Sequence, residues 1–184
     1  MKINRLLFAV FIILLAVFAV SHFAIKEKEN KFAPVKQTIK DAHITVTAPN
    51  LVRNEISEQN TKAALQKDID VIYFYNAEHK KISYTLVFSQ YKKEANLDNG
   101  IKSIINIFEN NNFVYEIKDN NIGNLEGKYI EGTYEKNDVK YGIKQQLVKK
   151  DKYFWQILVT FPFSEENDKT AKNYINSVEI DIVN

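Results

Sequence analysis

The chain has 184 residues, 45% of them hydrophobic, with three histidines and no cysteine. Such a length fits one domain with an appendage, and the lack of cysteine excludes disulfides, zinc-thiolate sites, iron–sulfur clusters and thiol catalysis. Lys2 and Arg5 account for the net charge of +2, because the other 23 basic residues (25 minus 2) balance 23 acidic ones. A neutral domain lacks the basic face that nucleic acid requires, so no nucleic-acid partner is expected.

The N-terminal stretch has the pattern of a targeting signal. Lys2 and Arg5 precede or flank an apolar run from Leu6 to Val20, and residues 23–25 extend it past Ser21 and His22. A signal peptide could be cleaved at the small residues 19–21, whereas an anchor needs about 20 apolar residues and fits residues 6–25. A buried core helix is disfavoured, because the run is apolar on all sides. Residues 1–25 are therefore predicted to be a signal anchor or a signal peptide.

Both interpretations place the domain outside the cytoplasm. An uncleaved segment would hold it at the inner or cytoplasmic membrane, with the membrane as a partner through residues 1–25. Cleavage would release it to the periplasm or the exterior. Residues 26–42 are rich in mixed charges and contain Pro34, which predicts an exposed polar tether. A single globular domain is expected at residues 43–184.

The first half of this domain alternates between strand signals and one helix signal. Residues 51–68 show no clear pattern. The stretch from Glu55 to Gln66 could form a short helix, but it has few apolar positions, so the segment is predicted to be irregular. Leu97, Ile101, Ile104, Ile105 and Phe108 form one apolar stripe, which predicts a helix over Leu97–Asn110 with Asn96 as its cap. Strands are expected at residues 43–48, closed by Pro49, and at 71–75, 82–91 and 113–117, with polar loops at Asn76–Lys81 and Asp119–Asn124.

The second half is dominated by a meander from Leu125 to Pro162. Strict alternation predicts a strand over Tyr153–Phe161. It is preceded by a strand over Val139–Val148 with one dry face and one wetter face that carries Lys140, Lys144 and Gln146. Charged turns at residues 135–138 and 149–152 separate three antiparallel strands. A second helix is predicted from Ser164 to Ser177, followed by a short strand over residues 178–183. The fold class is therefore α+β, an antiparallel sheet with two packing helices.

Short motifs follow one another in a recognisable order along residues 43–184. They are Thr47-Ala48-Pro49, the hairpin Val71–Tyr91, the helix Leu97–Asn110, Gly127-Lys128-Tyr129 before Gly132-Thr133-Tyr134, Tyr153-Phe154-Trp155, Phe161-Pro162 and Ile175-Asn176-Ser177-Val178. In pattern and element order the chain resembles the PsbP/Mog1-like family, although Asn50-Leu51 stands where that family usually has Gly-Trp. The resemblance implies an α/β/α sandwich that acts in binding or assembly, and the N-terminal segment fits only its bacterial envelope members.

No catalytic constellation stands out. The three histidines have no metal-ligand spacing, no serine has a nucleophile-elbow context, and no glycine-rich phosphate loop is present. Acids such as Asp68, Asp70, Asp119 and Glu131 leave carboxylate chemistry as a weak alternative. No cofactor, metal or catalytic residue is therefore predicted, and the protein is not expected to be an enzyme.

A partner or ligand surface is the remaining prediction for function. Tyr134 and Phe154 would line a groove if they lay on the outer sheet face, although core packing is favoured for them. His79 in the hairpin tip and Asn121 in the Asp119–Asn124 loop are further contact points, since loops commonly carry recognition. The leading hypothesis is an envelope protein whose non-catalytic domain binds another protein. The alternative is a small-ligand module with a site between the sheet and the Leu97–Asn110 helix.

Overall fold

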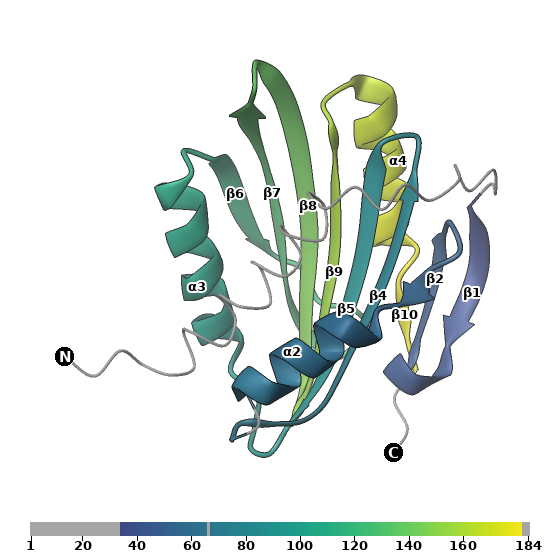
Figure 1. The fold of residues 1–184 in the computed structure, drawn as a ribbon, viewed down its shortest axis with the longest axis vertical. Coiled ribbons are helices and arrows are strands. Elements are labelled where there is room, and N and C mark those ends of the chain that lie inside the picture. The colour runs from purple at the N-terminus through teal and green to yellow at the C-terminus, as the bar shows by residue number, and fades with distance from the viewer. Residues whose placement is uncertain (1–33, 66, 182–184) are drawn as a thin grey trace.

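The computed structural model of the protein describes residues 34–65 and 67–181, which form an α+β fold of two antiparallel sheets and three α-helices (Figure 1). The predicted signal anchor or signal peptide at residues 1–25 lies outside the described residues. The helices are α2 (Glu55–Leu65), α3 (Leu97–Asn110) and α4 (Glu165–Asn176), with one 3-10 turn, η1 (Lys40–Ala42). The strands are β1 (Val35–Ile39), β2 (Ile44–Ala48), β3 (Val52–Arg53), β4 (Ile69–His79), β5 (Ile82–Tyr91), β6 (Val114–Asp119), β7 (Glu126–Lys136), β8 (Val139–Lys150), β9 (Tyr153–Pro162) and β10 (Glu179–Ile180).

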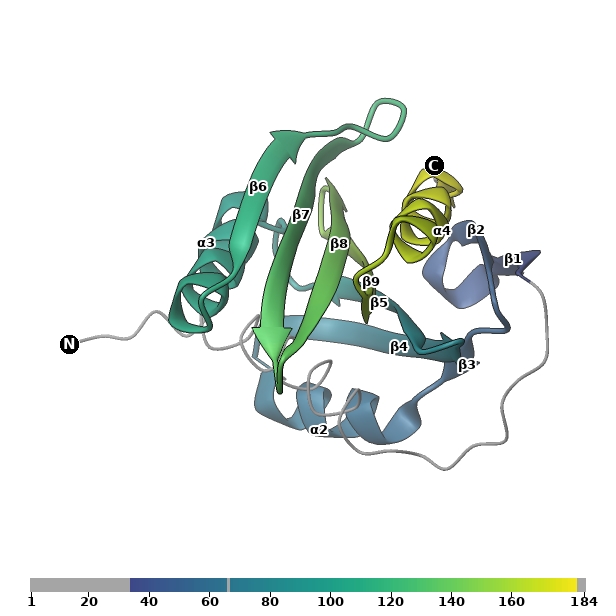
Figure 2. The same ribbon diagram turned by 90° about the horizontal axis from the view of Figure 1, so that it is seen from above.

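The larger sheet is covered on both faces. Its seven strands run in the order β3-β4-β5-β9-β8-β7-β6, and the smaller sheet has the order β1-β2-β10. Helices α2 and α3 lie on one face of the large sheet, whereas α4 and the small sheet lie on the other (Figure 2). We call these the α2/α3 face and the α4 face. Each face has its own hydrophobic core, so both sides of the central strands are buried.

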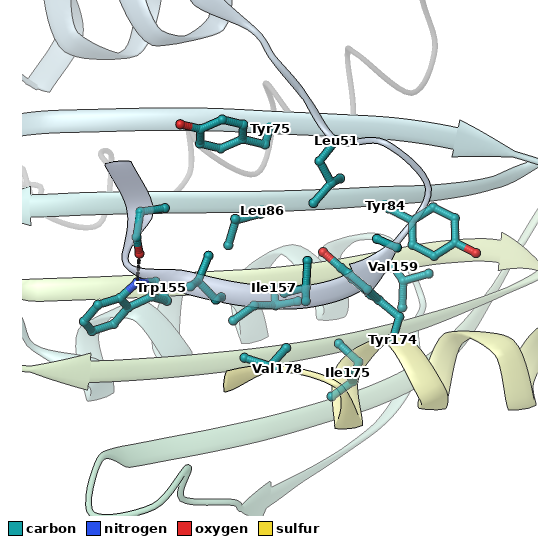
Figure 3. Close-up of a cluster of buried hydrophobic side chains, with 14 of the residues drawn as sticks. Leu51, Tyr75, Tyr84, Leu86, Trp155, Ile157, Val159, Tyr174, Ile175 and Val178 are labelled. Atoms are coloured by element: carbon teal, nitrogen blue, oxygen red, sulfur yellow. Dashed lines mark hydrogen bonds between the residues drawn. The ribbon is translucent and has the colours of Figure 1, made fainter. Parts of the chain in front are cut away.

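The core of the α4 face joins the small sheet to the large one. Tyr174 and Ile175 of α4 pack with Ile157 and Val159 of β9 (Figure 3), and Ala171 of α4 belongs to the same cluster. The buried indole of Trp155 donates a hydrogen bond from Nε1 to the carbonyl oxygen of Ala42 at 2.7 Å (Figure 3). This bond satisfies the polar atom of the tryptophan and fixes η1 against the sheet.

The predicted meander and both predicted helices are confirmed. Strands β7, β8 and β9 pair antiparallel, and the turn between β7 and β8 is Asn137-Asp138, both with positive φ (50° and 61°). Asn and Asp tolerate this left-handed geometry. Asn96 caps α3 by accepting a hydrogen bond from the backbone N–H of Asn99, and Ser164 caps α4 in the same way.

Three stretches differ from the prediction. Residues 51–68, expected to be irregular, contain β3 and the third helix, α2. The buried residues described in α2 are polar, so they form no apolar stripe: Ser57, Glu58 and Thr61. The predicted loop Asn76–Lys81 is mostly strand, because β4 continues to His79 and only Lys80 and Lys81 turn. Residues 35–39 of the predicted tether form β1, which pairs with β2.

The wetter face predicted for β8 is exposed at Lys140 but buried at Lys144 and Gln146. Lys144 is 5% exposed and Gln146 is fully buried, because β7, α4 and Asn120 in the loop after β6 provide polar partners for them. The burial of Lys144 and Gln146 could not be predicted, because their partners are distant in sequence.

Candidate functional site

Several polar side chains in the middle of the α2/α3 face are buried without hydrogen bonds. They are Ser89 and Gln145, both 0% exposed, and Gln156, 2% exposed. Ser89 Oγ, Gln156 Nε2 and both amide atoms of Gln145 have no hydrogen-bond partner within the described chain. A buried unpaired group of this kind costs about 1–3 kcal/mol, and native proteins contain few of them. Among the described residues, the other buried side-chain atoms without a partner are Thr61 Oγ1 of α2 and Tyr84 Oη on the α4 face. Most of these atoms therefore lie on the α2/α3 face, which calls for a functional explanation.

These three side chains form a diagonal line across adjacent strands, which we call the polar row. Ser89 on β5 lies opposite Phe154 on β9, two residues from Gln156. Gln145 on β8 lies opposite Leu158, which is two residues from Gln156 in the other direction. Diagonal neighbours of this kind are roughly 7–8 Å apart. Long amide side chains can therefore reach a common partner placed over the row.

The surroundings of the polar row are apolar and uncharged. Phe74, Val87 and Leu147 align with Gln156 across the sheet, and Ile130 lies opposite Gln145. All of these apolar residues belong to one buried cluster. Where this face carries charged side chains, they stand toward the ends of the strands: Glu78, Lys128 and Lys149. The centre of the α2/α3 face thus combines hydrogen-bonding groups with a hydrophobic setting.

Helix α2 adds a further polar group beside β4. Thr61, 1% exposed, leaves its Oγ1 without a hydrogen bond. Its neighbour on the inner side of the helix, Glu58, is fully engaged: the carboxylate accepts hydrogen bonds from Arg53 at 2.9 Å and from the backbone N–H of Phe74 at 3.1 Å. Glu58 thereby attaches α2 to β4, whereas the hydroxyl of Thr61 remains unused.

A second polar cluster, on the α4 face, is fully paired. The ammonium of Lys144 lies 3.0 Å from Glu131 of β7 and 2.9 Å from Asp168 of α4. Burial opposes the charge of Lys144, but these ion pairs outweigh it and raise the pKa of the ammonium. Burial likewise opposes the ionisation of Glu131, but the bonds from Lys144, Tyr129 and Lys118 prevail and lower the pKa of its carboxyl. This cluster connects α4 to the sheet and leaves no group unused, so we assign it a structural role.

The residues singled out from the sequence do not form one site. Phe154 is 6% exposed and packs in the core beside Tyr91. Tyr134 is half-buried on the same face and stacks between Phe113 and Tyr141, with ring centroids 4.4 and 5.3 Å away. His79 lies at the end of β4, and Asn121 is exposed in its loop, where its side chain accepts a hydrogen bond from Gly127 N–H at 3.0 Å.

The polar row was not predicted, although the sequence contains a signal for it. Gln156 interrupts an otherwise apolar and aromatic strand, and Gln145 and Gln146 stand together in β8. A polar side chain on a strand whose two faces are both covered cannot contact water.

In residues 34–65 and 67–181, no helix is long and apolar enough to cross a membrane, and no three acidic or histidine side chains gather as metal ligands.

Comparison with known proteins gives only distant likenesses. No protein-family model and no curated protein sequence matches the chain. LpqN of Mycobacterium tuberculosis, described as involved in cell envelope biogenesis, is 13% identical, with 59% of this chain and 68% of LpqN covered at a TM-score of 0.45. PA94 of Pseudomonas aeruginosa, a protein of unknown function described as a putative regulator, is 10% identical, with 83% and 98% covered at a TM-score of 0.43. These values assign no family or function, and membership of the PsbP/Mog1-like family stays a prediction.

Proposed function

We propose that the protein is a non-catalytic binding module of the cell envelope that holds a small molecule against the polar row. The carrying observation is the set of buried, unpaired atoms of Ser89, Gln145 and Gln156 on one sheet face. A ligand that pairs with them would remove the penalty of burying them. The basic start and apolar run of residues 1–25 support the envelope location.

The chemistry of the polar row favours binding over catalysis. Carboxamides and an isolated hydroxyl can orient a molecule, but none is a general acid or base near neutral pH. Ser89 would need an adjacent base to act as a nucleophile, and its neighbours across the sheet are Ile72 and Phe154. We therefore expect the bound molecule to leave the site unchanged.

A small molecule also accounts for the site better than a protein partner does. Protein interfaces usually centre on exposed aromatic anchors. In the part of the chain that the structure describes, Phe163 is the one aromatic among the exposed large hydrophobic residues, which are Val35, Val52, Ile56, Val114, Val139 and Phe163. The unpaired polar groups lie beneath the surface, where a flat protein surface does not reach them.

Two adjacent glutamines provide a matched test. Gln145 and Gln146 are both fully buried, but the Gln146 amide is paired: its Nε2 donates to the backbone oxygen of Asn120 at 2.8 Å, and its Oε1 accepts from Asn120 Nδ2 at 2.6 Å. We expect Gln145→Leu to stabilise the ligand-free protein by about 1–3 kcal/mol and Gln146→Leu to destabilise it by a similar amount. Denaturant unfolding of both variants measures this difference.

Ligand retention completes the test. The full chain, extracted from the envelope of its source cells and examined by native mass spectrometry, should carry a bound small-molecule mass that Gln145→Leu loses. If the wild-type chain carries no such mass, and Gln145→Leu destabilises it as much as Gln146→Leu does, the proposed function is wrong.

A further inference from the structure

We propose that β6, the outer strand of the large sheet, pairs antiparallel with β6 of a second copy of the chain, so that two large sheets join across a two-fold axis. This inference goes beyond the proposed function and does not depend on the polar row. Three properties of β6 support it: an open edge, the direction of its backbone groups and the order of its charges.

The outer edge of β6 offers an open template for another strand. Among the described strands, β6 stands at one end of the sheet order and pairs only with β7 (Figure 2). Its register with β7 runs from Val114 to Asp119 without a shift, and no proline interrupts it. Natural proteins commonly shorten, bulge or cover such edges, because unpaired backbone groups recruit another strand. A regular, open edge therefore suits strand addition.

The hydrogen bonds to β7 identify the backbone groups that face outward. The N–H of Asn120 donates to the carbonyl oxygen of Gly127 at 3.0 Å, so these residues continue the ladder as a hydrogen-bonded pair. Hydrogen-bonded and non-hydrogen-bonded pairs alternate along an antiparallel ladder. The even-numbered residues of β6 therefore bond to β7, whereas Tyr115, Ile117 and Asp119 direct their N–H and C=O groups to the open edge.

One two-fold register matches both the outward groups and the charges. When Ile117 lies opposite Ile117 of the second copy, Tyr115 of each copy faces Asp119 of the other, and about six backbone hydrogen bonds form. Glu116 of each copy then lies opposite Lys118 of the other, at non-hydrogen-bonded positions where Cα atoms are about 4.5 Å apart. The next register that matches the backbone is centred on Glu116 and would place two glutamates face to face, which is destabilising. The charges thus select the register centred on Ile117.

The side chains that would meet are accessible on both faces of the sheet. Glu116 and Lys118 are 60% and 50% exposed and pair with each other at 2.9 Å, so each can exchange its partner for the same residue of the second copy. They stand on the α4 face, where Lys118 also lies 3.3 Å from Glu131. Tyr115 and Ile117 are partly buried at the margin of the core on the α2/α3 face, which would continue from one copy to the other. This self-complementarity favours a second copy over a different protein.

The chain has no cysteine, so a single introduced cysteine tests the register. Ile117→Cys in the full chain, kept in a neutral detergent and mildly oxidised, should form a disulfide-linked dimer. Facing Cα atoms of a hydrogen-bonded pair are about 5.5 Å apart, within the range of a disulfide. Val114→Cys is the matched control: Val114 is 76% exposed on the same strand, but it would lie roughly 20 Å from its copy and should crosslink at least tenfold more slowly.

Exchanging the charges tests the same contact without a covalent bond. Glu116→Lys and Lys118→Glu should each raise the dimer dissociation constant at least tenfold in sedimentation equilibrium. An equimolar mixture of the two variants should dimerise as the wild type does, because every facing pair then joins opposite charges. Lys36→Glu removes a comparable exposed ion pair with Glu179 at β1, the outer strand of the small sheet, and should leave the dimer unchanged.

Several results would overturn the pairing of β6. They are a wild-type chain that stays monomeric throughout the concentration series, equal crosslinking of Ile117→Cys and Val114→Cys, and a mixture of charge variants that dimerises no better than its components. A dimer weakened by Lys36→Glu alone would place the contact on the small sheet and would also overturn the proposal.

Discussion

Replacing Lys144 by Met should release α4 from the large sheet. The side chain of Lys144 is 6% exposed and forms ion pairs with Glu131 and Asp168, which are 34% and 37% exposed. Methionine has a similar length but no charge, so the substitution would leave two neighbouring carboxylates without the cation between them. The carboxylates of Glu131 and Asp168 would then repel each other. The ion pair between Asp168, in the first turn of α4, and Lys144 of β8 would also be lost.

The expected magnitude follows from the partial burial of the partners. Removing one member of a fully buried pair typically costs 3–5 kcal/mol. Because both carboxylates are about one-third exposed, water screens part of the effect, and we expect a loss of about 2–3 kcal/mol. For a protein of this size, this corresponds to a decrease in Tm of roughly 5–10 °C. Asp168→Asn should cost less, since Lys144 keeps Glu131.

Denaturant unfolding of the two single variants and the double variant measures the coupling between Lys144 and Asp168. Lys150→Met, on the same strand, is the matched control and should change stability by less than about 0.5 kcal/mol. The wild-type contribution should also depend on pH: since folding lowers the pKa of Glu131 below 4.5, it is present above pH 4.5 and lost as the pH falls further. A Lys144→Met variant as stable as Lys150→Met would refute the structural role of this cluster.

Three further predictions concern stability. The double substitution Lys80→Asn and Lys81→Gly should stabilise the protein by roughly 1 kcal/mol. Both lysines have positive φ (50° and 64°) in a two-residue hairpin turn, and Asn-Gly adopts such a turn readily. An unchanged midpoint of denaturant unfolding would contradict this. Gly142→Ala should lower Tm, because an added Cβ would lie 2.4 Å from the buried ring of Phe161 and overpacking of this kind costs about 1–3 kcal/mol. An unchanged Tm would show that the ring moves aside without loss of stability. Burial raises the pKa of four tyrosine hydroxyls from 10.0 to about 12: Tyr75, Tyr91, Tyr129 and Tyr134. The contribution of these shifts to stability should therefore be complete below pH 10 and decline as the pH rises toward 12. Between these pH values, tyrosinate absorbance should appear only when the protein unfolds.

The parts of the fold that follow local patterns could be predicted from the sequence. The α3 stripe from Leu97 to Phe108 and its Asn96 cap involve residues close in the chain, so periodicity and capping chemistry identify the helix and its start. Helix α2 could not be found this way, because the buried residues described in it are the polar Ser57, Glu58 and Thr61. Glu58 is held there by Arg53 and by the edge of β4, and these contacts depend on tertiary structure.

The candidate site escaped prediction for a related reason. Alternation in β9 assigns Phe154 and Gln156 to one face, but it does not say whether water or protein covers that face. We favoured core packing for Phe154 and made no prediction for Gln156. The structure buries both, and Phe154 lies 3.6 Å from the position of a Cβ built on Gly100 of α3. Whether a polar side chain is paired depends on its neighbours across three strands, and that information is absent from local sequence.

The contrast between Gln145 and Gln146 is the strongest reason to regard the polar row as functional. Both side chains are fully buried on the same strand, so burial alone cannot explain why one is paired and the other is not. On the α4 face, Asn120 provides Gln146 with a complete set of bonds. On the α2/α3 face, an aliphatic side chain at position 145 would fit its neighbours Leu158 and Ile130 and would avoid the penalty of an unpaired amide. Proteins tend to give up stability of this kind where function requires it, and Ser89 and Gln156 repeat the pattern on the two adjacent strands.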